Sequence, residues 1–245
     1  MAKVMVVTGA GRGIGAATAR LAAERGYSVC VNYLRDRDSA ERLVKQIGKN
    51  ALAVAADISS ETDVMRLFAA VDRTPGRVTA LVNNAGIVDV RARVEDMTLE
   101  RLQRMFAVNV IGSFLCAREA VKRMSLRRGG AGGAIVNLSS VAARLGSPGD
   151  YVDYAAAKAA IDTFTLGLAK EVGGEGIRVN AVRPGVIRTG IHAASGDPGR
   201  LERIGASAPL ARPGEPEEVA RVILWLLSDE ASYMTGALVD VSGGR

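Results

Sequence analysis

Short runs of apolar and β-branched residues alternate with helical stretches along the whole chain, and this alternation restricts the folds that it can form. The strand-like runs cover residues 3–8, 28–33, 51–56, 79–83, 134–138, 177–182 and 237–241. The helical stretches cover residues 13–25, 38–48, 60–71, 98–124, 151–172 and 216–227. Strands of five or six residues that alternate with helices predict parallel βαβ units. Because runs such as VMVV are apolar throughout, we expect an α/β fold, a doubly wound parallel sheet with helices on both faces.

No internal repeat and no linker divides the 245 residues. A single domain, 1–245, is the simplest interpretation, and a chain of this length can bury a full core. Residues 184–214 are rich in Gly and Pro, and one short helix is expected near 199–206. Within this stretch we expect residues of about 186–210 to form a substrate loop or lid, because long loops over a site often close on substrate.

The composition excludes several kinds of chemistry. One His (His192) and two Cys (Cys30 and Cys116) provide no ligand set at the spacings of zinc sites, so we expect no metal. Two distant cysteines make no disulfide framework, which favours a reducing, cytoplasmic location. We find neither a signal peptide nor an apolar stretch of membrane-spanning length, and expect no membrane partner. An enzyme of this composition needs an acid/base group other than histidine.

The net charge of +6 comes with 26 Arg against six Lys. These arginines are scattered, and the densest group lies at residues 118–128. Scattered charge is typical of a solvated surface, whereas a nucleic-acid-binding protein concentrates positive charge in a patch. We therefore expect no nucleic-acid partner, and a shift assay at low salt tests that alternative.

Three glycines follow the first predicted strand. Gly9, Gly13 and Gly15 stand in TGAGRGIG (8–15), between the strand and the first helix. Glycines there let the backbone turn tightly and let a pyrophosphate approach the helix N-terminus. The position favours nucleotide binding on a Rossmann-like sheet over a plain glycine-rich turn.

The end of the second strand favours one nicotinamide cofactor over the other. A carboxylate there would bind the ribose 2′-hydroxyl and repel a 2′-phosphate. No carboxylate occurs before Asp36, and the residues ahead of it include Tyr33 and Arg35. Arg35 and Arg12 could both face a 2′-phosphate, which favours NADP(H), with NAD(H) possible. The alternative is that both arginines are merely exposed.

A tyrosine and a lysine stand four residues apart, at Tyr154 and Lys158, near the start of a predicted helix. This spacing places both side chains on one helix face, where an ammonium favours the phenolate and lowers the tyrosine pKa. Such a tyrosine can exchange a proton with a carbonyl oxygen and needs no histidine. Ser140, at the end of the preceding strand, could donate a hydrogen bond to the same oxygen. The alternatives are an ordinary amphipathic helix and a strand-to-loop turn.

In these motifs, and over essentially its whole length, the sequence resembles the short-chain dehydrogenase/reductase family. The resemblance rests on TGAGRGIG (8–15), NNAG (83–86), Asn109, LSS (138–140), YAAAK (154–158), RPGVIRT (183–189) and TGALVDVSGG (235–244). It implies a catalytic tetrad of Asn109, Ser140, Tyr154 and Lys158, in which Asn109 anchors a water behind Lys158; Ser139 is the weaker choice of serine. Family reductases often carry VDGG where this chain has VSGG (241–244), which loosens the subfamily assignment. The nearest branch is 3-oxoacyl-carrier-protein reductase-like and sugar dehydrogenase-like.

The resemblance also implies the cofactor contacts and the assembly. The implied contacts are Gly9, Arg12, Gly13 and Ile14 at the phosphates, Asp57 and Ile58 at the adenine, Asn84, Ala85 and Gly86 at the ribose, Tyr154 and Lys158, and Pro184, Gly185, Ile187 and Thr189 at the nicotinamide. To these the glycine spacing adds Gly15, and the end of the second strand adds Tyr33 and Arg35. A homo-oligomer, tetramer or dimer, is implied on helices 98–124 and 151–172.

These features together predict an NADP(H)-dependent oxidoreductase that transfers a hydride between the nicotinamide and a small-molecule carbonyl or secondary alcohol, 3-oxoacyl reductase-like. One alternative is an NAD(P)-dependent sugar or polyol dehydrogenase. Another, of a different class, is a non-catalytic cofactor-sensing regulator, which the presence of both Tyr154 and Lys158 disfavours. The substrate wall is expected to include polar residues such as Arg144, Tyr151 and His192, and His192 is equally well read as an exposed loop residue.

Overall fold

The structure is a computed structural model that describes residues 2–190 and 199–245. Its centre is one seven-stranded sheet in the order β3-β2-β1-β4-β5-β6-β7, and every neighbouring pair is parallel. The strands are β1 (Lys3–Val7), β2 (Ser28–Tyr33), β3 (Ala51–Ala55), β4 (Arg77–Asn83), β5 (Gly133–Leu138), β6 (Ile177–Pro184) and β7 (Leu238–Val241). The predicted doubly wound α/β fold is therefore confirmed.

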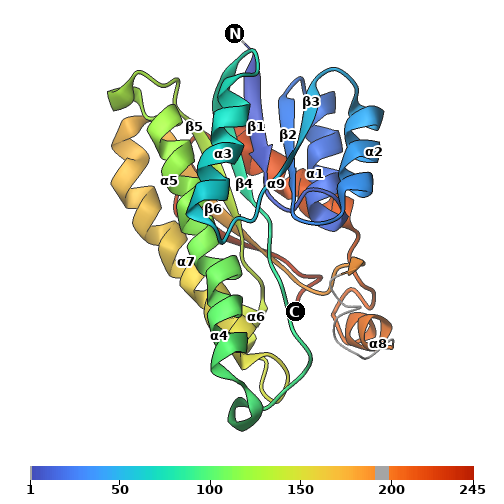
Figure 1. The fold of residues 1–245 in the computed structure, drawn as a ribbon. Coiled ribbons are helices and arrows are strands. Elements are labelled where there is room, and N and C mark those ends of the chain that lie inside the picture. The colour runs from blue at the N-terminus through green and yellow to red at the C-terminus, as the bar shows by residue number, and fades with distance from the viewer. Residues whose placement is uncertain (1, 191–198) are drawn as a thin grey trace.

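Helices cover both faces of the sheet, as Figure 1 shows. They are α1 (Gly13–Glu24), α2 (Arg37–Ile47), α3 (Glu61–Asp72), α4 (Leu99–Phe106), α5 (Gly112–Met124), α6 (Ala142–Leu145), α7 (Val152–Val172), α8 (Arg200–Ala206) and α9 (Pro216–Leu227). The pleat alternates the side chains of each strand between two apolar cores. On β1, Met5 and Val7 pack with α1, α2 and α9, while Val4 and Val6 pack with α3, α5 and α7.

The long helix predicted over residues 98–124 is interrupted. Thr98 caps its start, but the helix divides into α4, a π-helical turn (Ala107–Ile111) and α5. Asn109, inside the turn, donates its side-chain amide to the Met105 carbonyl and to the loop carbonyl of Ile87. The turn therefore lies where a side chain bonds backbone groups of its own helix and of the loop after β4. Single π-helical turns of this kind are frequent at functional sites.

Several sequence predictions concern residues 191–198, which lie outside the described residues. These include His192 and the middle of the predicted lid at 186–210. Within residues 2–190 and 199–245, no helix is long and apolar enough to cross a membrane. The same residues contain no group of three or more His, Cys, Asp or Glu that could hold a metal ion.

Candidate active site

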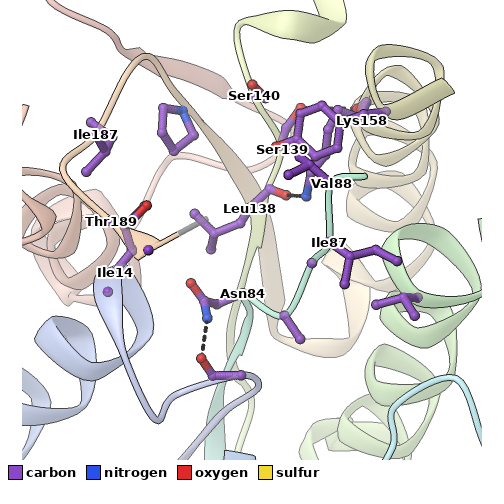
Figure 2. A pocket seen from close by; sticks show the side chains of 18 of the residues that line it. Ile14, Asn84, Ile87, Val88, Leu138, Ser139, Ser140, Lys158, Ile187 and Thr189 are labelled. Carbon is purple, nitrogen blue, oxygen red and sulfur yellow. Dashed lines mark hydrogen bonds between the residues drawn. The ribbon is translucent and has the colours of Figure 1, made fainter. Parts of the chain in front are cut away.

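The carboxyl ends of the strands open into a cavity of about 890 Å³. Figure 2 shows Ile14, Ile187 and Thr189 on one side of it, with Ser140 and Lys158 across from them. Most of the residues that the sequence singled out line this cavity: Gly9, Arg12, Gly13, Ile14, Tyr33, Arg35, Asp57, Ile58, Asn84, Ala85, Gly86, Ser140, Tyr154, Lys158, Pro184, Gly185, Ile187 and Thr189. Gly15 and Asn109 are not among the lining residues.

The glycine turn before α1 is held close to the loop after β4. Gly9 has φ +61°, and a Cβ there would come within 2.9 Å of the Ala85 Cα. Asn84 donates its side-chain amide to the carbonyls of Thr8, at 2.7 Å, and Gly9, at 3.0 Å. A Cβ at Gly15 would lie 2.5 Å from that same amide, so Gly15 allows close packing instead of lining the cavity. The turn thus requires glycine for backbone approach.

The N-terminus of α1 is free to receive an anion from the cavity. Its capping residue, Arg12, makes no side-chain capping hydrogen bond, and its first turn carries no acidic residue. The first backbone N–H groups of a helix have no partner within the helix, and its dipole favours negative charge there. This arrangement fits the pyrophosphate of a dinucleotide.

The loops after β1, β2 and β3 carry the charged groups at the next part of the cavity. Arg12 and Arg35 both line it, and neither forms an ion pair with a described residue. Asp36 also lines it, but its carboxylate accepts the Ser39 amide at 3.0 Å at the start of α2. That hydrogen bond holds the pKa of Asp36 below its usual value. Asp57 accepts from the amide and the hydroxyl of Ser59.

Ser140, Tyr154 and Lys158 meet at the end of β5. The Ser140 side chain lies close enough to the Tyr154 hydroxyl to lower its pKa, and the Ser140 hydroxyl accepts the Ala142 amide at 3.1 Å. Lys158 is buried, donates to the Leu138 carbonyl at 2.6 Å, and has its Nζ 5.6 Å from the centre of the Tyr154 ring. Ser139, by contrast, is buried and donates to the Lys158 carbonyl. Its hydroxyl is bound to α7 backbone, which favours Ser140 as the serine that faces a substrate.

The pKa values of this group differ from the sequence-based expectation. Burial raises the pKa of Tyr154 to about 12, and the Ser140 hydrogen bond lowers it only in part. Burial lowers the pKa of Lys158 to about 8, opposed by the Asp162 carboxylate. The expected lowering of the Tyr154 pKa by Lys158 is therefore wrong for this structure. The reason is that the ammonium is directed at the Leu138 carbonyl and desolvation outweighs its field at the phenol.

Asn109 lies behind the cavity wall. Its Oδ1 accepts the Ile87 amide at 3.1 Å and its Nδ2 donates to the Ile87 carbonyl at 3.0 Å, so it fixes both polar groups of that residue. A Cβ at Gly86 would lie 2.7 Å from Asn109 Oδ1 and 3.5 Å from Lys158 Nζ. Gly86 therefore separates the two side chains, and only a glycine leaves room for them.

A buried ion pair beside Tyr154 was not predicted. Arg101, on α4, binds Asp153 through Nε at 2.7 Å and Nη2 at 3.3 Å, and donates to the Val90 carbonyl at 2.6 Å. Asp153 Oδ1 also accepts the Tyr154 amide at 2.9 Å. The side chains are 11% and 0% exposed. The position of Asp153 next to Tyr154 is a weak indication of a role at the site. Its partner Arg101 stands 52 residues earlier in the chain, and no local sequence pattern indicates that the two side chains meet.

The parallel sheet, the glycine turn at a free helix N-terminus and the Ser140–Tyr154–Lys158 group together define the class of dinucleotide-dependent oxidoreductases. Residues 9–245 match the family model described as enoyl-(acyl carrier protein) reductase. The chain belongs to the short-chain dehydrogenase/reductase family and is an NAD(P)-dependent oxidoreductase.

Relatives of known sequence and structure match the chain from end to end. It is 54% identical to "Uncharacterized oxidoreductase YgfF" of Escherichia coli K12, over 99% of each chain. It is 40% identical to a 3-oxoacyl-[acyl-carrier-protein] reductase of Synechocystis, over 99% of this chain and 96% of the relative. The solved structure of a 3-ketoacyl-(acyl-carrier-protein) reductase from Brucella melitensis, complexed with NADH, superposes with a TM-score of 0.92 at 35% identity, over 99% of this chain and 98% of that one.

Proposed function

We propose that this oxidoreductase uses NADP(H) to interconvert a carbonyl and a secondary alcohol, with Ser140, Tyr154 and Lys158 as catalytic residues. The observation that carries the proposal is the meeting of these three side chains on the wall of the cavity into which the α1 N-terminus opens. The group needs no histidine and no metal. It provides a proton donor, a second hydroxyl and a cation at one place.

When bound, the nicotinamide supplies or accepts the hydride. In the reducing direction, the Tyr154 hydroxyl gives its proton to the substrate oxygen, and Ser140 donates a hydrogen bond to the same atom as negative charge develops on it. Lys158, whose Nζ lies 5.6 Å from the centre of the Tyr154 ring, supplies a positive charge beside the tyrosinate that remains after the proton has left. Asn109 is a positioning residue: it fixes the Ile87 backbone beside Lys158.

The preference for NADP(H) rests on Arg12 and Arg35, which line the cavity without an ion-pair partner among the described residues. Guanidinium groups bind phosphate bidentately. We expect the double variant Arg12→Ala, Arg35→Ala to raise KM for NADPH at least about tenfold, with KM for NADH changed little. Steady-state kinetics with both cofactors test this. Equal losses for both would contradict the 2′-phosphate assignment.

The first substrate class to test is the 3-oxoacyl thioester, since the Synechocystis relative and the Brucella melitensis structure bear that activity in their names. A spectrophotometric screen of NADPH oxidation across acyl, steroid, sugar and small-ketone carbonyls tests the proposal. Sugar-alcohol oxidation with NAD(P)⁺ is the alternative outcome. Absence of turnover with every class would favour a cofactor-sensing regulator.

We also propose a cytoplasmic homo-oligomer, tetramer or dimer, formed through α4, α5 and α7. Large apolar side chains are exposed on these helices and on the π-helical turn between α4 and α5, namely Phe106, Ile111, Phe114 and Leu166. Phe114 stacks on Phe164 with ring centres 3.8 Å apart, so an apolar surface spans α5 and α7. Contiguous exposed apolar surface of this kind marks protein–protein contacts.

A further inference from the structure

The charged side chains on the cavity wall are unevenly distributed. Its two carboxylates, Asp36 and Asp57, follow β2 and β3, at the end that the dinucleotide's adenosine would take. The other charged side chains on the described part of the wall are all cationic, and they belong to Arg12, Arg35, Arg104, Lys158 and Arg245. Arg12 and Arg35 belong with the cofactor under the proposed function, and Lys158 with Tyr154. Arg104 and Arg245 are left without a role.

Arg245 is held in place by its backbone. A main-chain oxygen of Arg245 accepts from Arg144 Nη2 at 3.1 Å and from the Ser242 hydroxyl at 3.0 Å. Arg144 in turn binds the Asp240 carboxylate, on β7, at 3.0 Å. Figure 1 shows the C-terminus at the same end of the sheet as α6, the helix that carries Arg144.

This anchoring brings Arg245 to the side of the cavity where Ser140 lies. Helix α6 begins two residues after Ser140, and Ala142 and Leu145 of that helix line the cavity together with Arg245. Arg245 is half-buried as a whole residue, and its side chain forms no ion pair with a described side-chain carboxylate, although the Arg144 side chain does. A fixed backbone with an unpaired guanidinium on the wall is suited to bind an anion that enters with the substrate.

We propose that Arg245 is a specificity residue that binds a carboxylate or phosphate on the substrate whose carbonyl lies at Ser140 and Tyr154. The inference rests on the proposed function and adds the class of substrate to it. Arg is suited to this role because its planar fork binds carboxylate and phosphate through two parallel hydrogen bonds. Arg104 is exposed on α4 and lacks such an anchor, so we assign the anion to Arg245.

The test compares matched aldehydes that differ only in charge: 4-carboxybenzaldehyde, 4-formylphenyl phosphate and methyl 4-formylbenzoate. We expect Arg245→Ala to raise KM at least about tenfold for one or both anionic aldehydes, with less than about a twofold change for the neutral ester. The anion with the larger loss identifies the group that the site recognises. Arg245→Lys, which keeps the charge but not the fork, should fall between. Arg73→Ala, an exposed arginine on the C-terminal end of α3, is the charge-matched control.

Three results would overturn the inference. The first is that Arg245→Ala changes KM equally for charged and neutral aldehydes, and the second is that Arg104→Ala instead shows the selective loss for anionic aldehydes. The third is that Arg245→Ala raises KM for NADPH, which would place Arg245 at the cofactor. Circular dichroism confirms that each variant is folded. Calorimetric binding of 4-(hydroxymethyl)benzoate and its methyl ester separates the two proposals, because it needs no turnover. If no aldehyde is reduced, the proposed function fails. The inference about Arg245 is still supported if Arg245→Ala binds 4-(hydroxymethyl)benzoate more weakly and its methyl ester equally well. Unchanged binding of 4-(hydroxymethyl)benzoate overturns it.

Discussion

Lys158 is a cation buried with one hydrogen bond, and that environment has a cost in stability. Burial lowers its pKa from the ordinary 10.5 to about 8 in the folded chain. Below pH 8 the side chain is charged in both the folded and the unfolded state, so folding must desolvate the charge. Between pH 8 and 10.5 the unfolded state binds more protons, and the free energy of unfolding therefore rises with pH as far as this group is concerned.

We therefore expect Lys158→Met to increase the free energy of unfolding at pH 7 by about 2 kcal/mol, because the methionine side chain has a similar length but carries no charge to bury. The gain over the wild type should shrink as the pH rises from 8 towards 10.5, since the lysine becomes neutral in the wild type. Urea unfolding at pH 7 and near pH 10 measures both values. A variant that is less stable at pH 7, or a pH-independent difference, would contradict the burial argument.

The individual site residues differ in how far the sequence revealed them. Tyr154 and Lys158 were recognisable because four residues on a helix fix their shared face. Ser140 followed from its position at a strand end. The pKa of Tyr154 was not predictable, because it depends on how deeply the phenol is buried and on where the ammonium points, and neither is encoded in the spacing.

Among the elements, α4 and α7 are joined by the Arg101–Asp153 pair, which also holds the backbone amide of Tyr154. Removing one partner of a buried ion pair leaves the other charge uncompensated. We expect Arg101→Met to lower the free energy of unfolding by about 3 kcal/mol and to lower kcat more than it raises KM for NADPH. Arg101→Lys should recover part of both, because it keeps the charge but loses the fork.

The exposed pair between Arg93 and Glu95 provides the matched control, with side chains 70% and 63% exposed. Arg93→Met should change stability by less than about 1 kcal/mol. Denaturant unfolding and steady-state kinetics of the three variants decide the matter. If Arg101→Met behaves as Arg93→Met does, the buried pair does not position Tyr154.

The helices also show which features the local sequence pattern does not predict. The predicted starts at residues 60 and 98 agree with α3 and α4, where the Ser60 and Thr98 hydroxyls accept the backbone amides of Asp63 and Arg101. The π-helical turn at 107–111 was missed: residues 98–124 have one continuous helical pattern. The turn lies where Asn109 bonds Ile87, a contact between segments 22 residues apart.

For the whole molecule, the order of the strands was the feature hardest to predict from the sequence, and the class of fold was the easiest. Apolar runs such as 4–7 and 134–138 indicated a covered parallel sheet, and the two cores on its faces agree with that. Strand order depends on crossover connections, which leave no mark on any one segment. The anchoring of Arg245 by Arg144, 101 residues apart, was hidden for the same reason.

The exposed apolar surface of α5 and α7 gives a prediction at this scale. We expect Leu166→Glu to shift the protein to a smaller species, because a buried unpaired charge at an interface is unfavourable. Met65→Glu, on α3, introduces the same charge at a similarly exposed apolar position and should leave the assembly unchanged. Light scattering after size-exclusion chromatography measures the mass. A wild-type monomer, or an unchanged assembly in Leu166→Glu, would contradict an interface on these helices.

The central proposal is that Tyr154 exchanges the proton during carbonyl reduction. The most direct measurement is the NADPH-dependent turnover of Tyr154→Phe on the best carbonyl from the substrate screen, with NADPH binding measured in parallel by fluorescence titration. Exposed Tyr233→Phe is the control. We predict that kcat falls at least about a hundredfold in Tyr154→Phe while NADPH binding is retained. Turnover at the wild-type rate in that variant would contradict the proposal.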